Sequence, residues 1–314
     1  MDGILIIDKP ENFTSHDVVA RLRRILKTKR IGHTGTLDPF ATGVLVMLVG
    51  KATRLAQFLD RDAKEYEAVV RFGFETTTGD LTGERKGEEE KRRRGEEEII
   101  SVDEIEKVLG DFRGTIEQTP PMYSAKKVDG KKLYELARQG IEIERKSVKV
   151  TIYGLEIIES RVESRESRDE DQRPKTEDHA LRVACSAGTY IRTLAEGIGR
   201  RTGTGAHLAE LRRTRAGKFD LSQAVTIEEL DAIVAAGKLD DYLISMNEAV
   251  AHLPPVILSE KEIEDTRNGK KLRLETNEFA DNQTVRMIDA AENLIAVGFY
   301  LKREKSIQPK LVLL

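Results

Sequence analysis

The sequence contains very few of the residues that build disulfides and metal centres. Cys185 is the only cysteine in 314 residues, so no disulfide can form within the chain. It lies in the run LRVACSAG, which is typical of a buried strand, and we expect it to pack as a core side chain. The five histidines are scattered, without the spacing of a metal site: His16, His33, His179, His207 and His252. No metal site is indicated.

Long apolar runs and common hydrolase motifs are also missing. No stretch of about 18 apolar residues is present, and the opening MDGILIIDKP lacks the order of a signal peptide, so we expect a cytoplasmic protein. There is no GxSxG motif. The segment GVLVMLVGKAT has the Gly-Lys pair of a phosphate-binding loop, but Ala52 replaces the required Ser or Thr. Hydrolase and NTPase activities are therefore not supported.

The chain does contain enough apolar residues for a core, at 39%, together with 34% charged residues. Strand-like and helix-like segments alternate over most of the chain, and short alternating runs follow. This pattern predicts an α+β protein with a large domain at 1–250 and a small β-rich domain at 251–314. Two strongly charged stretches, about 84–98 and 161–178, are typical of surface insertions.

The net charge of −3 conceals an uneven distribution. Residues 220–314 hold 17 acidic and 11 basic residues, whereas 21–30 hold six basic residues and no acidic one. Residues 188–218 hold seven basic and two acidic residues. Such clusters are often solvated helix faces, but they also suit a phosphate backbone. Charge alone leaves both interpretations open.

Two segments place reactive side chains in defined local settings. The loop GHTGTLDPFATG presents one acid, Asp38, and Pro39 fixes the backbone directly after it. The acid is either a reactive carboxylate or the cap of an Asp-Pro turn. The segment CSAGTYIRTLAEGIG places Arg192 in the first turn of a predicted helix from Tyr190 to about Arg201. Its guanidinium could pair with a carboxylate from another segment or lie on the surface.

Five blocks in a fixed order resemble the TruB family of tRNA pseudouridine synthases. They are GHTGTLDPFATGVL, KEYEAVVRFGFETTTGD, QTPPMYSAKKVDGKKLYELARQG, CSAGTYIRTLAEGIG and AHLAELRRTRAGKF, and with the opening IIDKP they span about residues 3–220. The resemblance implies the pseudouridine synthase fold, a mixed and mainly antiparallel sheet flanked by helices, with a small PUA-like domain at the C-terminus. Asn12 replaces the Gly that usually follows the Lys-Pro motif, and both residue types tolerate a positive φ.

The resemblance also implies roles for particular residues. Asp38 would be the essential acid, Arg192 its ion-pair partner, and Tyr66 the aromatic residue over the target base. His33 would occupy the base-flipping site, although a hydrogen bond within the turn is the simpler interpretation of that residue alone. The other expected RNA contacts, carried mainly by helix-and-loop segments around 21–30 and 200–218, are Lys9, Arg21, Lys29, Arg30, Lys64, Tyr190, Arg212 and Arg213.

The implied reaction is the isomerisation of a uridine in the T-loop of tRNA, at position 55, after the nucleotide is flipped out. It involves no net redox change or group transfer, so no cofactor is expected. Asp38 has to stay ionised, and we expect Arg192 to lower its pKa. The sequence does not decide between a covalent adduct and elimination at the sugar. We expect a monomer that binds the T-arm stem-loop without an obligatory protein partner. A tRNA-folding protein and a guided synthase of ribosomal RNA remain alternatives.

Overall fold

The computed structural model describes residues 1–86, 100–124, 127–128, 130–137, 139–141, 143–162, 177–274 and 278–313. The predicted insertions at 84–98 and 161–178 lie largely outside these ranges. Their described ends belong to the folded body: Arg85 forms an isolated bridge with Thr76, and both Asp178 oxygens accept hydrogen bonds from Arg71, at 2.6 and 2.7 Å. The predicted insertion boundaries were therefore too wide, because charged residues at both ends take part in pairing.

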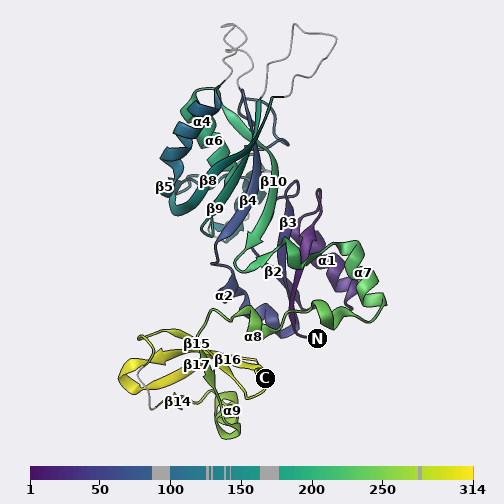
Figure 1. Cartoon of the computed structure of the whole chain (residues 1–314), viewed down its shortest axis with the longest axis vertical. Helices are drawn as coiled ribbons and strands as arrows, with labels where there is room; N and C mark the ends of the chain where they lie inside the picture. The colour runs from purple at the N-terminus through teal and green to yellow at the C-terminus, as the bar shows by residue number, and fades with distance from the viewer. Residues whose placement is uncertain are drawn as a thin grey trace.

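A ten-stranded sheet forms the larger part of the protein (Figure 1). Its main path is β12-β1-β3-β10-β4-β9-β8-β5, with β2 beside β3 and β11 beside β10. The pairs β1–β12 and β3–β10 are parallel and the remaining pairs are antiparallel, which confirms a mixed, mainly antiparallel sheet. The strands are β1 (Gly3–Lys9), β2 (Ile31–Thr34), β3 (Thr42–Val49), β4 (Lys64–Phe72), β5 (Gly114–Gln118), β8 (Val148–Val162), β9 (Glu177–Cys185), β10 (Ala206–Ala216), β11 (Phe219–Asp220) and β12 (Ala224–Val225).

The hydrophobic pattern of each strand follows from its place in the sheet. Strands β1 and β3 are buried on both faces, so their sequences GILIIDK and TGVLVMLV are almost continuously apolar. Strand β4 alternates instead, and the predicted inward side chains are all buried: Tyr66, Ala68, Val70 and Phe72. Cys185 is also buried, at the end of β9, and burial raises the pKa of its thiol to about 11. The sequence interpretation of β4 and of the cysteine is confirmed.

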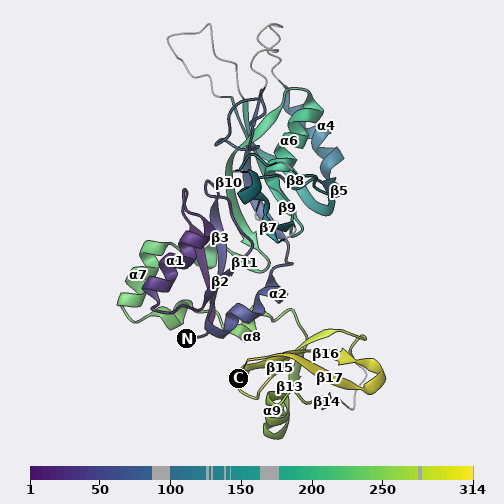
Figure 2. The same ribbon diagram turned by 180° about the vertical axis from the view of Figure 1, so that it is seen from behind.

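Helices cover the sheet in two pairs that lie side by side in both views (Figures 1 and 2). One pair is α1 (Ser15–Ile25) with α7 (Ile227–Ala235), and the other is α4 (Val102–Leu109) with α6 (Ile191–Thr202). Helix α1 begins at a capping box between Thr14 and Asp17. Before it, Asn12 has a φ of 63°, as its replacement of a glycine predicted. The shorter helices are α2 (Ala56–Leu59), α5 (Leu133–Ala137) and α8 (Met246–Ala249), and a two-stranded ribbon joins β6 (Lys127–Val128) to β7 (Lys131–Lys132).

The basic stretch 206–216 was predicted as part of a helix-and-loop segment, but it is strand β10, in the middle of the sheet. Its leucines and alanines are good helix formers, yet both edges of this segment pair with strands, β3 on one side and β4 on the other. The tertiary position of the segment therefore overrides its local preference. His33, predicted in a loop, likewise lies in the short strand β2.

The C-terminal residues form a second sheet of five strands, in the order β13-β15-β16-β17-β14. It shares a core with the large sheet: Val297 and Leu311 cluster with Ile4 and Val46. Among the described residues no helix is long and apolar enough to cross a membrane. The elements are β13 (Pro255–Ile257), α9 (Glu260–Arg267), β14 (Leu272–Arg273), β15 (Thr284–Ile288), β16 (Leu294–Leu301) and β17 (Ser306–Val312).

Candidate active site

Asp38 and Arg192 meet across the centre of the large sheet. Asp38 lies on the loop between β2 and β3, and Arg192 lies in the first turn of α6. Arg192 Nε is 3.0 Å from Asp38 Oδ2, and Arg192 Nη2 donates to Asp38 Oδ1 at 3.3 Å. The arginine side chain is only 6% exposed, whereas the aspartate side chain is 33% exposed. The predicted ion pair is present, and one partner remains accessible to a substrate.

Three further groups hold the Arg192 guanidinium. It donates to the carbonyls of Thr78, at 3.0 Å, and Tyr123, at 2.6 Å, and Nη1 lies 3.2 Å from Asp80 Oδ2. Asp80 is fixed in turn, because its Oδ1 accepts hydrogen bonds from the Thr78 hydroxyl at 2.7 Å and the Thr82 amide at 3.0 Å. Sequence reasoning assigned no role to Asp80. The motif TTTGD, with an acid after three threonines, was the available signal.

The pKa of Asp38 is raised above its usual value, which is opposite to the sequence prediction. Burial of the carboxyl group is the largest cause, and the negative charge of Asp80 adds to it. Arg192 lowers the pKa without reversing the shift. The prediction was wrong because it gave the guanidinium more weight than the burial of the carboxyl group, and because it did not include the second carboxylate bound to that guanidinium. A raised pKa makes the ionised form of Asp38 a better base and nucleophile.

Tyr66 lies near Asp38 but is mostly covered. Its side chain is in the core cluster and the residue is 8% exposed. Burial raises the pKa of the Tyr66 hydroxyl, the positive charge of Arg213 lowers it, and the charge of Asp38 raises it further. The phenol is therefore protonated at neutral pH. Only an edge of the ring is open to a substrate in this conformation.

Lys9 is completely buried and holds the backbone around the catalytic loop. Its ammonium donates to the carbonyls of Phe13 at 2.6 Å, Pro10 at 2.8 Å and Pro39 at 3.1 Å. Burial lowers the pKa of Lys9 to about 8, although the charge of Asp38 opposes that shift. All three of its bonds go to backbone carbonyls inside the protein, so the predicted contact of Lys9 with RNA gains no support from this structure.

Two other residues predicted as RNA contacts are also buried. Arg213 is 1% exposed and donates to the carbonyls of Val44 and Gly35. Lys64 is 8% exposed and donates to the carbonyls of Asp60 and Asp62, both at 2.8 Å. In this structure both cations are covered and bind backbone carbonyls, so their predicted contacts with RNA gain no support from it. Burial varies along one strand, because Arg212, next to Arg213, keeps a partly exposed side chain.

The remaining predicted contacts lie at accessible positions. Arg21 and Lys29 are exposed, and exposed Arg30 donates to the Thr53 hydroxyl at 3.3 Å. The Arg212 side chain is 38% exposed and pairs with Asp8 at 2.7 Å. Arg21 lines a pocket of about 420 Å³ between α1 and α7.

Tyr190 and His33 are both partly covered. Tyr190 is the N-cap residue of α6, and its amide donates to Gln118 at 3.0 Å. The His33 ring lies edge-on to His16, with centroids 5.8 Å apart. Burial is the largest cause that lowers the pKa of His33 to about 4, so its ring is neutral at neutral pH. No hydrogen bond joins His33 to Asp38 among the described residues, so the simpler turn interpretation gains no support.

A pocket of about 540 Å³ lies next to the backbone that holds Arg192. Its lining includes Thr78 and Tyr123, whose carbonyls bind Arg192, but neither Asp38 nor Arg192 lines it. Among the described residues no cluster of three or more metal-ligating side chains is found. The site therefore offers one accessible carboxylate with a buried guanidinium behind it.

Comparison with known proteins agrees with this arrangement. Residues 23–191 match the family model for the N-terminal domain of TruB family pseudouridylate synthases, and 192–251 match that for the C-terminal domain of tRNA pseudouridylate synthase B. The relative from Geobacillus thermodenitrificans (strain NG80-2), named tRNA pseudouridine synthase B, is 47% identical over 274 residues, covering 87% of this chain and 86% of the relative. The Bacillus cytotoxicus relative of the same name is 41% identical over 314 residues, covering 100% and 97%.

Solved structures show the same architecture. A chain from the crystal structure of a Cbf5-Nop10-Gar1 complex aligns with a TM-score of 0.72 and 26% identity, over 99% of this chain and 85% of that chain. A chain from an H/ACA RNP bound to a substrate RNA containing 2'-deoxyuridine gives 0.71 and 26% over the same shares. Together with the matched domains and the identity over most of its length, these results show that the chain belongs to the TruB family of pseudouridine synthases.

Proposed function

We propose that the chain converts the uridine at position 55 of tRNA, in the T-loop, into pseudouridine, with Asp38 as the reacting acid. The observation that carries this proposal is the contact of both Asp38 oxygens with the buried Arg192 guanidinium, while a third of the Asp38 side chain stays exposed. The relatives named tRNA pseudouridine synthase B supply the substrate class. The enzyme would meet this substrate in the cytoplasm.

The reaction requires a positioned carboxylate and no external reactant. The N1–C1′ bond of the flipped uridine breaks, the base turns, and C5 bonds to C1′; C5 then loses its proton and N1 gains one. The product is an isomer of the substrate, so no cofactor is needed. Ionised Asp38 promotes this either by attacking the sugar or by removing a proton from it. Arg192 fixes the carboxylate for both routes, since a side-on guanidinium restricts its rotation.

Tyr66 and His33 are assigned to the base. The charge of Asp38 helps to raise the pKa of the Tyr66 hydroxyl, so the two side chains are close, and the ring of Tyr66 would contact the freed uracil. His33, neutral at neutral pH, is suited to fill the space that the extruded nucleotide vacates, because a neutral ring can stack without desolvating a charge. Both roles require that the nucleotide leaves the stack before the chemistry begins.

The exposed cations would follow the phosphates of the T-arm. We assign this role to Arg21, Lys29, Arg30 and Arg212, with Tyr190 near the nucleotide itself. Recognition of a stem by such contacts reads the shape of the A-form helix more than its sequence, and affinity falls as salt rises.

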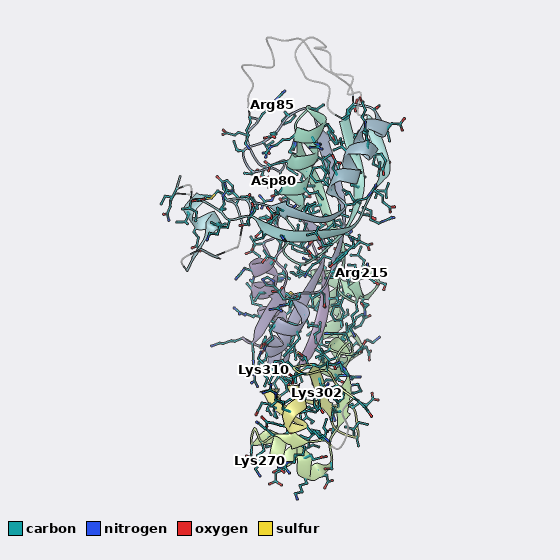
Figure 3. The ribbon with its side chains drawn as sticks, turned by 90° about the vertical axis from the view of Figure 1, so that its left-hand side faces the viewer. Asp80, Arg85, Arg215, Lys270, Lys302 and Lys310 are labelled. Carbon is teal, nitrogen blue, oxygen red and sulfur yellow. The ribbon has the colours of Figure 1, made fainter. Side chains whose placement is uncertain are left out.

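The C-terminal sheet is assigned as a PUA-like RNA-binding domain, residues 251–314, attached to a catalytic domain at 1–250. Lys270, Lys302 and Lys310 belong to this domain, at the end of the molecule opposite Asp80 (Figure 3), and Lys310 lies in β17. The Lys310 ammonium lies 4.8 Å from the centre of the Phe299 ring, which gives an aromatic surface beside a cation. An RNA that contacts both this sheet and Asp38 must be long, as a tRNA is.

The decisive experiment is to incubate purified protein with an unmodified tRNA transcript and to map pseudouridine along it. We expect one product, at position 55, and the same product in an isolated T-arm stem-loop. Modification of another position would contradict the T-loop assignment. A requirement for an added protein or guide RNA would contradict action as an autonomous monomer, which light scattering of the free protein tests separately.

A further inference from the structure

Arg213 is a buried cation that the proposed chemistry does not use. It is 1% exposed, in the middle of strand β10, and no carboxylate pairs with it among the residues that the structure describes. A buried charge without a counter-charge is costly unless hydrogen bonds compensate it. The neighbouring Arg212, by contrast, pairs with Asp8. The free-energy cost of burying this charge points to a role for Arg213 other than stability.

The hydrogen bonds of Arg213 join the two ends of the catalytic loop. Nη2 donates to the carbonyl of Gly35 at 3.0 Å, three residues before Asp38, and Nε donates to the carbonyl of Val44 at 2.7 Å, six residues after it. One planar guanidinium thus fixes the distance between both ends of the segment that carries the acid. Gly35 has a φ of 68°, and a Cβ there would lie 3.2 Å from Arg213 Nη1.

The same guanidinium reaches Tyr66. Arg213 and Tyr66 are register partners in the β10–β4 pair, so their side chains share one face of the sheet. The positive charge of Arg213 lowers the pKa of the Tyr66 hydroxyl, which places the guanidinium close to the phenol. One guanidinium therefore binds both ends of the catalytic loop and lies beside Tyr66.

We propose that Arg213 is a positioning residue that holds both ends of the catalytic loop in place beside Tyr66, so that the acid and the phenol keep fixed positions around the bound nucleotide. The inference rests on the proposed roles of Asp38 and Tyr66. It differs from the phosphate contact that the sequence predicted for Arg213, since a tie inside the protein acts on the chemical step and a phosphate contact acts on RNA affinity.

The test compares Arg213→Lys and Arg213→Met with Arg182→Met as a matched control. Arg182 lies in strand β9, is 46% exposed and pairs with Glu156. With saturating tRNA in a single turnover, we expect both Arg213 variants to slow pseudouridine formation about 10²-fold, because small displacements of reacting groups have effects of that order. The control should keep its rate. Affinity for tRNA and its salt dependence should stay within about twofold in all three variants.

Two outcomes overturn the proposal. A rate within about threefold of wild type would show that the tie is dispensable. Weaker tRNA binding with a shallower salt dependence and an unchanged rate would show that Arg213 contacts phosphate after all. Arg213→Lys keeps the buried charge but cannot bridge the two carbonyls in the same way, so it separates geometry from charge.

A double-mutant cycle with Tyr66→Phe separates positioning from general stability. If Arg213 acts partly through the Tyr66 hydroxyl, Arg213→Lys should slow the Tyr66→Phe enzyme at least threefold less than it slows the wild type. Strictly additive effects would remove Tyr66 from the proposal. Gly35→Ala, which crowds the guanidinium from the loop side, should slow the reaction in the same way while tRNA binding is kept.

Hydrogen exchange gives a readout that does not depend on activity. The amide of Leu37 donates to the Ser15 hydroxyl at 3.0 Å, and the amide of Ala41 donates to the carbonyl of Asp38 at 3.1 Å. Both amides should exchange faster in Arg213→Met than in wild type or Arg182→Met. Unchanged exchange rates of these two amides in Arg213→Met would refute the proposal that Arg213 holds the loop in place. If wild-type protein made no pseudouridine in tRNA, the proposed function would fail. The exchange measurement would still show whether Arg213 holds the loop in place.

Discussion

Asp38 and Asp80 bind the same guanidinium: Arg192 Nε lies 3.0 Å from Asp38 Oδ2, and Arg192 Nη1 lies 3.2 Å from Asp80 Oδ2. The two carboxylates differ in exposure, since the Asp38 side chain is 33% exposed and the Asp80 side chain is 6% exposed. Asp80 thus orients the guanidinium from the buried side, and Asp38 presents the reactive oxygen on the open side. Each acid also changes the electrostatics of the other.

Asp80→Asn should slow pseudouridine formation while tRNA affinity stays nearly constant. The buried carboxylate that orients Arg192 would be lost, and we expect a decrease of about 10- to 100-fold in the single-turnover rate. Because the Asp80 charge raises the pKa of Asp38, its removal should also shift the acid limb of the pH–rate profile to lower pH. A limb that moves to higher pH would contradict this electrostatic coupling.

The neutral state of His33 predicts a pH dependence of stability. Its pKa in the folded protein is about 4, below the usual 6.5, so between these values the unfolded chain binds more protons. The free energy of unfolding should therefore fall as the pH drops from about 6.5 to 4, by at most about 3 kcal/mol from this group. Urea unfolding of wild type and His33→Gln at several pH values between about 6.5 and 4 measures this change in the free energy of unfolding. An identical slope in the two proteins would exclude His33 as a contributor.

Lys9→Met should impair catalysis rather than tRNA binding. The ammonium holds three backbone carbonyls, including that of Pro39, next to the reacting acid. Without it the loop loses an anchor, and we expect a single-turnover rate lower by about 10-fold or more. Filter binding at several salt concentrations should give the wild-type slope. A shallower slope would instead show that Lys9 contacts an RNA phosphate.

Exposed and buried cations should differ in their effect on salt dependence. Arg21→Gln or Lys29→Gln should each make the plot of log affinity against log salt less steep by about 0.7 to 1, the value for one lost phosphate contact. Lys64→Gln is the matched control, because both donor bonds of Lys64 end on backbone carbonyls. Equal changes in all three variants would contradict the division into exposed and buried cations.

The sequence predicted elements better than side-chain environments. The alternation of KEYEAVVRF, which became β4, depends on neighbouring residues, and the strand it predicts was confirmed. The ion pair of Asp38 and Arg192 joins segments 154 residues apart, and it was foreseen only through the family resemblance. No local pattern indicates which cations a central strand buries, so the burial of Arg213 was not predicted. The direction of the Asp38 pKa shift was missed because it depends first on how deeply the fold buries the carboxyl group, and then on Asp80, which reaches Arg192 from another segment.

The most direct test is the single-turnover rate of pseudouridine formation by Asp38→Asn at saturating tRNA, with tRNA affinity measured in parallel. The substitution keeps the size of the side chain but removes the charge that meets the sugar. We expect no detectable product and a Kd within about twofold of wild type, since Asp38 contributes no phosphate contact. Pseudouridine formed at the wild-type rate would contradict the central claim that the carboxylate of Asp38 carries the reaction.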